Sequence, residues 1–136
     1  MSEEHAPYSV QREDCLFCSE GFQSRIVATN STVFAIEDKF PVTPRHLLII
    51  PFRHSQDYFS LTEQEHKDAE VLLRMLKNKI QEEDKTVTGF NVGMNCGESA
   101  GQSIMHTHIH LIPRRDGDVT EPKGGIRGVI PEMQSY

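Results

Sequence analysis

The chain has 136 residues, a formal net charge of -6 and 25% charged residues, which fits one globular domain of ordinary composition. The acidic balance argues against a protein that binds long nucleic acid, because such proteins need a basic surface. No apolar run approaches the roughly 18 residues that a membrane span requires. The acidic N-terminus lacks the apolar region of a secretory signal, so we expect a cytoplasmic protein with a flexible tail over residues 1–14.

Five short strands are expected from the patterns of apolar and turn residues: Arg25–Thr29, Thr32–Asp38, His46–Pro51, Val87–Asn95 and Ile104–Ile112. Asn30 and Ser31 separate the first two strands, which predicts a hairpin. The third segment is almost continuously apolar, which is typical of a strand buried on both faces.

One long helix is expected over about residues 62–84. Thr62 and Glu65 have the spacing of a capping box, which marks a helix start. Apolar residues then recur at helical spacing, namely Ala69, Leu72, Leu73, Leu76 and Ile80. Strands in series around one helix predict an α+β fold with a mainly antiparallel five-stranded sheet.

The most informative segment is Gly101–Pro113, which contains His106, His108 and His110 at intervals of two. On a strand this spacing places the three imidazoles on one face, and Met105, Ile109 and Leu111 on the opposite, core-facing side. Three adjacent histidines make poor core material, because each ring has two nitrogens that need partners.

Three interpretations of this segment compete. The first is a solvated polar face without a function. The second is a catalytic zinc site, although i, i+2 and i+4 positions on a strand spread too widely for one tight tetrahedral ion. The third is a histidine nucleophile flanked by helper histidines, since a neutral imidazole can attack phosphorus without first losing a proton.

The H-x-H-x-H run, together with Glu98–Ser103, Phe34–Asp38, Pro44–Pro51 and Asn95, resembles the histidine triad (HIT) superfamily of nucleotide hydrolases and transferases. The resemblance extends from about Cys15 to Asp118 and implies a HIT-like domain over residues 15–113. Residues 114–136 would form a C-terminal tail at the site rim or in a dimer. Two positions differ from the usual pattern: Thr107 replaces an apolar residue, and Arg45 replaces a glycine that often precedes the equivalent of His46.

The resemblance also implies roles for individual residues. His108 matches the nucleophile, and His110 and His46 match the histidines that contact the phosphate and move protons. Asp38 matches the residue that binds the ribose hydroxyls. The loop that holds the phosphate and the leaving group matches Asn95, Gly101, Gln102 and Ser103, with backbone N–H groups near Gly101 as further donors.

A second candidate site is the pair Cys15-x-x-Cys18. An inert turn and a redox pair are both possible interpretations, although no expected strand precedes the motif as a redox pair would require. Two thiolates are also half of a closed tetrahedral zinc site. The zinc-bearing branch of the HIT superfamily joins a similar pair to two histidines, which here correspond to His54 and His106, and so implies a structural zinc.

The resemblance favours cleavage at the α-phosphate of a diadenosine polyphosphate, with magnesium as a possible companion of the substrate. A nucleoside phosphoramidase with the same nucleophile is the first alternative. A catalytically idle nucleotide-binding module is the second. Family members are typically homodimers with a sheet continued across the two protomers, so a homodimer that binds a small nucleotide, and neither long nucleic acid nor a membrane, is expected.

Overall fold

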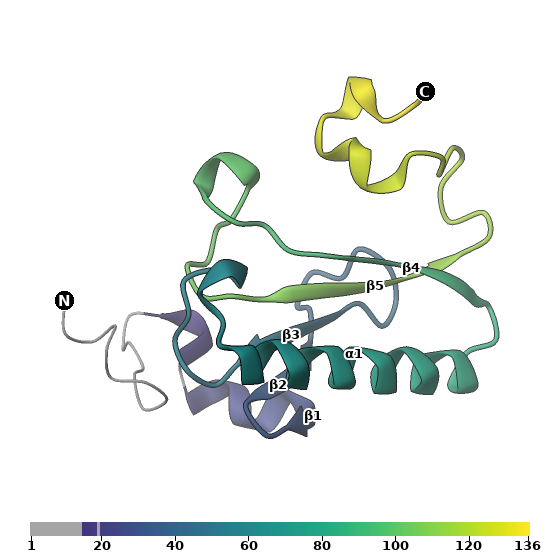
Figure 1. Ribbon diagram of the computed structural model, residues 1–136. Helices are drawn as coiled ribbons and strands as arrows, with labels where there is room; N and C mark the ends of the chain where they lie inside the picture. Colours follow the sequence, from purple (N-terminus) through teal and green to yellow (C-terminus); the bar gives the residue numbers. More distant parts are fainter. Residues whose placement is uncertain (1–14, 19) are drawn as a thin grey trace.

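The structure is a computed structural model that describes residues 15–18 and 20–136. One long helix, α1 (Glu63–Glu83), lies along a five-stranded sheet (Figure 1). The strands are β1 (Ile26–Asn30), β2 (Val33–Glu37), β3 (Leu47–Pro51), β4 (Val87–Gly93) and β5 (Ile109–Arg115). Their order across the sheet is β1-β2-β3-β5-β4, and every neighbouring pair is antiparallel. The predicted α+β class is therefore confirmed, whereas the tail predicted over residues 1–14 lies outside the described residues.

The sheet separates two apolar layers, because successive side chains of a strand point to opposite faces. On β3, Leu47 and Ile49 pack against α1, while Leu48 and Ile50 pack on the other side. All five residues of β3 are buried, as predicted for a strand covered on both faces. The layer opposite α1 also contains Phe17, from the segment between the two cysteines.

The helix begins and ends as its sequence predicts. Thr62 accepts a hydrogen bond from the N–H of Glu65, and the Glu65 carboxylate accepts one from the N–H of Thr62, which completes the capping box. The buried stripe contains Ala69, Leu72, Leu76 and Ile80. It covers the face of the sheet to which Ile109 and Leu111 of β5 contribute.

The last strand begins later than predicted. β5 starts at Ile109 rather than at Ile104 and continues to Arg115, where it still pairs with Val87 of β4. Before it, the N–H of Thr107 donates to the carbonyl of Ser55 at 2.6 Å, and the Thr107 hydroxyl contacts the same residue. These bonds hold the chain on the loop after β3, so Met105 lies at the surface and not in the predicted core position.

The loop before β3 contains a residue in a left-handed conformation. Arg45 has a φ of +73°, which costs about 1 kcal/mol in a residue other than glycine. The family's frequent glycine at this position therefore has a physical reason, since glycine adopts that conformation without penalty. The Arg45 guanidinium bonds Glu83 in the last turn of α1 at 2.7 Å, which ties the strained loop to the helix.

The C-terminal segment lies beyond the sheet (Figure 1). After β5 it forms two 3₁₀ turns, Gly125–Val129 and Pro131–Met133, in an otherwise irregular path. A Cβ added at Gly93 of β4 would lie 3.5 Å from Ile126, so the segment passes beside this strand. No helix within the described residues is both long and apolar enough to cross a bilayer.

A buried ion pair fastens the loop after β3 to the start of α1. Arg53 donates to both carboxylate oxygens of Glu65 at 2.9 and 3.0 Å, and Glu65 is fully buried. Arg53 also donates to the carbonyls of His54 and Ser60. Since a planar guanidinium and a carboxylate match in two parallel bonds, this pair fixes both the loop and the helix start.

Replacing Glu65 with glutamine should therefore lower the free energy of unfolding by about 3 kcal/mol, because the substitution leaves the Arg53 charge without its buried partner. Urea denaturation of the purified protein measures this. Glu70→Gln is the matched control, because it breaks the exposed Arg74–Glu70 pair on the same helix and should change the value by less than about 1 kcal/mol. Equal losses in the two variants would contradict this role for the buried pair.

Candidate active site and metal centre

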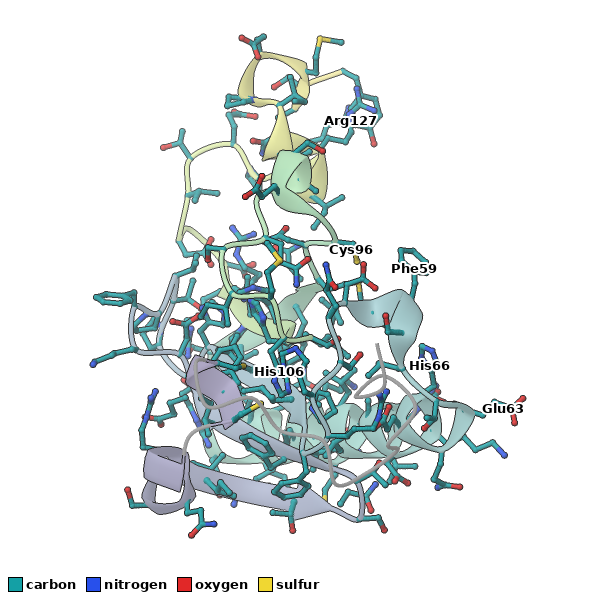
Figure 2. The ribbon with its side chains drawn as sticks, turned by 90° about the vertical axis from the view of Figure 1, so that its left-hand side faces the viewer. Phe59, Glu63, His66, Cys96, His106 and Arg127 are labelled. Atoms are coloured by element: carbon teal, nitrogen blue, oxygen red, sulfur yellow. The ribbon has the colours of Figure 1, made fainter. Side chains whose placement is uncertain are left out.

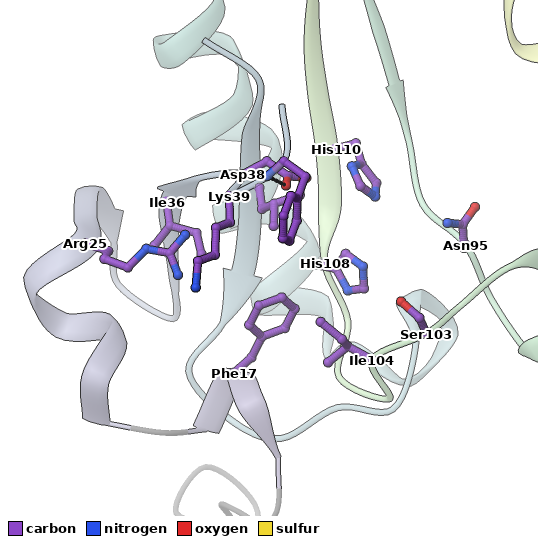
Figure 3. Close-up of a pocket in the computed structure, with 12 residues that line it drawn as sticks. Phe17, Arg25, Ile36, Asp38, Lys39, Asn95, Ser103, Ile104, His108 and His110 are labelled. Atoms are coloured by element: carbon purple, nitrogen blue, oxygen red, sulfur yellow. Dashed lines mark hydrogen bonds between the residues drawn. The ribbon is translucent and has the colours of Figure 1, made fainter. Parts of the chain in front are cut away.

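A pocket of about 370 Å³ opens on the face of the sheet opposite α1. Its volume lies in the range of about 300–1,000 Å³ that small-molecule sites occupy. Its walls come from the N-terminal turn, β2, β3, the loop before β5 and β5 itself (Figure 3). They comprise Phe17, Arg25, Ile36, Asp38, Lys39, Phe40, Leu48, Asn95, Ser103, Ile104, His108 and His110. The structure thus gathers five predicted site residues around one cavity.

The ring of His108 is fixed in one tautomer by the backbone of His106. Its Nδ1 lies 2.9 Å from the carbonyl oxygen of His106, and a carbonyl can only accept a hydrogen bond. Nδ1 must therefore carry the proton, which leaves the lone pair of the neutral ring on Nε2. Because the ring also lines the pocket, its unprotonated nitrogen is available as a nucleophile.

His46 and His110 are joined by a hydrogen bond whose direction follows from the partners of His46. The N–H of Val42 donates to Nδ1 of His46 at 3.0 Å, so a neutral His46 carries its proton on Nε2. That nitrogen lies 2.9 Å from Nδ1 of His110, which must then accept. The proton of neutral His110 is consequently on Nε2. Its ring lines the pocket, where this N–H can donate to a bound anion.

Burial favours the neutral form of both rings. Desolvation lowers the pKa of His110 to about 4; the neighbouring His108 and His46 act in the same direction, and Asp38 opposes them. Burial also lowers the pKa of His46, against the opposing charge of Asp38. Near pH 7 the pair therefore holds two protons in a fixed direction, as the tautomers above require.

Asp38, expected to bind the ribose, stands at the end of β2. One carboxylate oxygen accepts from the N–H of Phe40 at 2.8 Å, and the other lies 3.4 Å from Nε2 of His46. Donor atoms of Asp38, His46 and His110 lie within 4.8 Å of one another, the spacing of a metal site. However, a metal on Nε2 of His46 would require an imidazolate, since the Val42 N–H already occupies Nδ1, so this trio is better suited to proton transfer.

Of the residues predicted from the loop before β5, some line the pocket and others do not. Asn95 and Ser103 line the pocket, and Figure 3 shows them beyond the two histidine rings. Gln102 does not, because its buried side chain accepts from Gly97 and donates to the carbonyls of Gln56 and Ile104. It holds the loop in place.

The main-chain N–H groups that we predicted as phosphate donors serve the same loop. The N–H of Gly101 donates to Glu98, and that of Gln102 donates to Gly97. Gly101 has a φ of +97°, which explains why a glycine stands there. In this structure these two residues shape the loop, and the polar side chains of Asn95 and Ser103 are the ones from it that line the pocket.

The four predicted metal ligands come together at one point. Nδ1 of His106 lies 3.3 Å from the sulfur of Cys15 and 3.5 Å from that of Cys18, and Nδ1 of His54 lies 3.4 Å from Cys18. A tetrahedral zinc ion with ordinary bond lengths separates sulfur and nitrogen ligands by about 3.5 Å. The donor set and its spacing therefore fit a closed zinc site, and the structure brings the four residues together.

The proton on His106 also suits a metal ligand. Its Nε2 lies 2.9 Å from the carbonyl of Pro51, to which it donates, so the lone pair on Nδ1 points at the cysteines. His106 is fully buried near the middle of the molecule (Figure 2), and desolvation lowers its pKa to about 4. Its ring therefore points to the cysteines and not into the pocket. The prediction that all three histidines share one face is wrong, because the chain is not a continuous strand from His106 to His110.

Sequence analysis assigned no role in the site to seven residues of the pocket, namely Phe17, Arg25, Ile36, Lys39, Phe40, Leu48 and Ile104. Phe17 is one of the two residues between the cysteines, and the Cys-x-x-Cys pattern assigns no role to these positions. Arg25 donates to the carbonyl of Glu37 at 2.9 Å and reaches the pocket from the 3₁₀ turn that precedes β1. The C-terminal tail, predicted at the site rim or in a dimer, contributes none of the residues that line this pocket. Arg114 pairs with Asp118, and Arg127 lies far from His106 (Figure 2).

Known proteins resemble this chain over most of its length. The sequence profile of the HIT domain family matches residues 20–117. AP-4-A phosphorylase from Mycobacterium tuberculosis is 35% identical over 115 residues, which cover 79% of this chain and 56% of that protein. Bis(5'-adenosyl)-triphosphatase from Dictyostelium discoideum is 33% identical over 96 residues, which cover 71% of this chain and 64% of that protein. The chain thus spans between one half and two thirds of each enzyme.

Solved structures agree with the fold. The crystal structure of a Zn-bound histidine triad family protein from Mycobacterium smegmatis superimposes with a TM-score of 0.70 at 26% identity, covering 79% of this chain and 80% of that one. A hypothetical histidine triad nucleotide-binding protein from Sulfolobus tokodaii has a TM-score of 0.69 at 32% identity, covering 79% and 73%.

The depressed pKa of His110 predicts a pH dependence of stability. Its pKa is near 6.5 in the unfolded chain and about 4 in the folded chain. Between these two pH values the unfolded chain binds a proton at this histidine and the folded chain does not. Its contribution is therefore complete above pH 6.5 and is lost as the pH falls towards 4. Urea denaturation at pH 7, 6 and 5 should show wild type losing stability more steeply than His110→Gln. Parallel pH profiles for the two proteins would contradict the assignment.

Proposed function

Because the chain belongs to the HIT domain family, we propose that it cleaves nucleotides at the α-phosphate through a nucleotidyl intermediate on His108. The observation that carries the proposal is the hydrogen bond from Nδ1 of His108 to the His106 carbonyl. It leaves Nε2 unprotonated on a pocket wall. Matched relatives include a phosphorylase and a triphosphatase whose names specify adenosine polyphosphates, which supports an enzyme of this class.

The reaction has two displacements at phosphorus. In the first, Nε2 of His108 attacks the α-phosphorus, and the bond to the leaving group breaks with its electron pair. A phosphate leaves as the anion, whereas an amine takes up a proton from solvent as it leaves. The new positive charge of the substituted ring is stabilised by the His106 carbonyl, which still accepts from Nδ1. In the second, water attacks the same phosphorus, the P–N bond breaks, and neutral His108 is restored.

The neighbouring side chains suit the developing charge. The Nε2–H of His110 can donate to a non-bridging oxygen, and the Ser103 hydroxyl and Asn95 amide can contact the other oxygens or the leaving group. Asp38 lies on the ribose side of this arrangement, with the apolar Ile36 and Leu48 beyond it for a base. His46 keeps the His110 proton directed at the phosphate.

The preferred substrate is a diadenosine polyphosphate, in keeping with the names of the two matched enzymes. A nucleoside phosphoramidate is the alternative, because the same nucleophile would release an amine instead of a phosphate. A catalytically idle nucleotide-binding module is the other alternative. Magnesium bound with the polyphosphate remains a prediction.

A structural zinc on Cys15, Cys18, His54 and His106 belongs to the same proposal. Four protein ligands leave no open position, so the ion would not take part in the chemistry. It would fasten the N-terminal turn to the segment that carries His108. A Zn-bound relative supports this choice of metal.

We also propose a homodimer. β4 is an edge strand, and an unprotected edge tends to pair with another chain. Beside it, Leu73, Val92 and Met94 line a groove between β4 and α1, and Val92 is 49% exposed. A second copy could cover these apolar side chains and continue the sheet.

The covalent intermediate is the direct test of the proposed function. Wild-type protein mixed with diadenosine polyphosphate, or with adenosine phosphoramidate, and quenched in alkaline denaturant should carry an adenylyl group on His108 by peptide mass spectrometry. His108→Ala should carry none, and its kcat should fall by at least about 10³-fold. AMP should still bind the variant.

His66→Ala is the matched control, because His66, in the first turn of α1, meets Tyr58 edge-to-face and does not line the site pocket. It should form the adduct as wild type does. An adduct on another residue, or hydrolysis without any adduct, would refute the nucleophile. Binding of AMP with no turnover of either substrate would favour the idle module.

Protein purified without chelator should contain about one zinc ion per chain, as one closed Cys₂His₂ site requires. Cys18→Ser should weaken zinc binding at least about tenfold in a competition with a chromophoric chelator. Cys96→Ser should not change it, because Cys96 lies outside the ligand cluster. Equal affinity in all three proteins would exclude this site.

A further inference from the structure

The side chain of Phe17 joins the metal centre to the nucleotide pocket. Phe17 stands between Cys15 and Cys18, and the N–H of Cys18 donates to the carbonyl of Cys15 at 3.1 Å, which closes a tight turn around it. The turn directs the phenyl ring inward, where it is only 6% exposed. Figure 3 shows the ring at the base of the pocket, beneath His108.

The ring contacts both histidines that define the two sites. It meets the ring of His106, a metal ligand, with centroids 5.9 Å apart and an interplanar angle of 88°. It meets His108, the nucleophile, with centroids 5.2 Å apart and an angle of 69°. Both are edge-to-face contacts, the geometry that aromatic rings favour.

Phe17 also packs with the layer that forms the pocket wall. Its apolar cluster contains Phe34, Ile36, Leu48 and Ile50, with Cys15 and Ile104 packed against it. Ile36, Leu48 and Ile104 are themselves lining residues of the pocket. The position of Phe17 therefore determines part of the surface on which a base would lie.

From this arrangement we propose that metal binding and nucleotide binding are thermodynamically coupled through Phe17. With the metal bound, both cysteines are fixed and the turn between them holds Phe17 against His108. Without the metal, Cys15 and Cys18 lose the bonds that hold the turn in place. Part of the free energy of nucleotide binding must then be spent on ordering the Phe17 ring. Metal should therefore tighten nucleotide binding, and nucleotide should tighten metal binding by the same factor.

This inference rests on the proposed nucleotide site and adds to the zinc a role that a purely structural ion would not have. A structural ion supports the fold alone, so its affinity would not respond to an occupied pocket. A coupled ion responds, and the response passes through one side chain. That difference can be measured without any turnover.

The experiment measures the zinc affinity of the full chain by competition with a chromophoric chelator, with and without saturating 5'-AMP. In wild type, AMP should tighten zinc binding about tenfold, within the usual range of such couplings. In Phe17→Ala the two affinities should be equal at AMP concentrations that saturate the variant. Phe17→Leu, which keeps an apolar side chain in the layer, serves if the alanine variant does not fold, and should show a reduced shift.

Phe40→Ala is the matched control. Phe40 also lines the pocket, but it is 82% exposed and lies after β2, away from the metal turn. Its loss should weaken AMP binding and leave the shift in zinc affinity intact once AMP saturates. Circular dichroism of each protein reports whether the metal-free chain is folded.

The outcomes separate the two claims. If wild type binds AMP but its zinc affinity does not change, the coupling is refuted while the proposed function stands. If Phe17→Ala shows the full wild-type shift, the coupling does not pass through Phe17. If metal-loaded wild type does not bind AMP, the proposed function itself fails.

Discussion

The hydrogen bond between Nδ1 of His108 and the carbonyl of His106 determines what this site can do. It holds one proton on the inner nitrogen and leaves the outer one free to attack. The carbonyl is available because the chain before β5 has left the sheet and bonds to Ser55 instead. The ring of His106 then turns to the cysteines, so this one residue contacts the proposed metal ligands with its side chain and the proposed nucleophile with its backbone.

The sheet supplies the second constraint, which is alternation. On β5, Ile109 and Leu111 pack beneath α1, so His110 faces the opposite side, where β2 and β3 contribute Ile36 and Leu48 to the pocket. The same alternation on β3 sends one set of side chains to the helix and the other to the pocket layer. A core and a reactive site are thus built from the two faces of the same strands.

Patterns that depend on local chemistry were readable from the sequence. The capping box of Thr62 and Glu65 and the helix stripe depend on few neighbours and were found where predicted. The grouping of the cysteines with His54 and His106 is not local, since Cys15 and His106 are 91 positions apart, and it was implied by the resemblance to the HIT superfamily. The start of β5 could not be predicted from local patterns, because it depends on a contact between Thr107 and Ser55, which are 52 positions apart. The pocket contains Phe17, Arg25 and Lys39, which were not predicted there, and lacks Gln102, which was. In both cases tertiary contacts that no local pattern encodes decide the position of the side chain.

The central claim is that phosphorus is displaced twice, first by His108 and then by water. Each in-line displacement inverts the configuration at phosphorus, so two give net retention. A substrate that is chiral at the α-phosphorus through sulfur and oxygen isotopes, hydrolysed in isotopically labelled water, measures this in the released nucleotide by ³¹P NMR. The account predicts retention. Inversion would mean that water attacks directly, and would contradict the assignment of His108 as nucleophile.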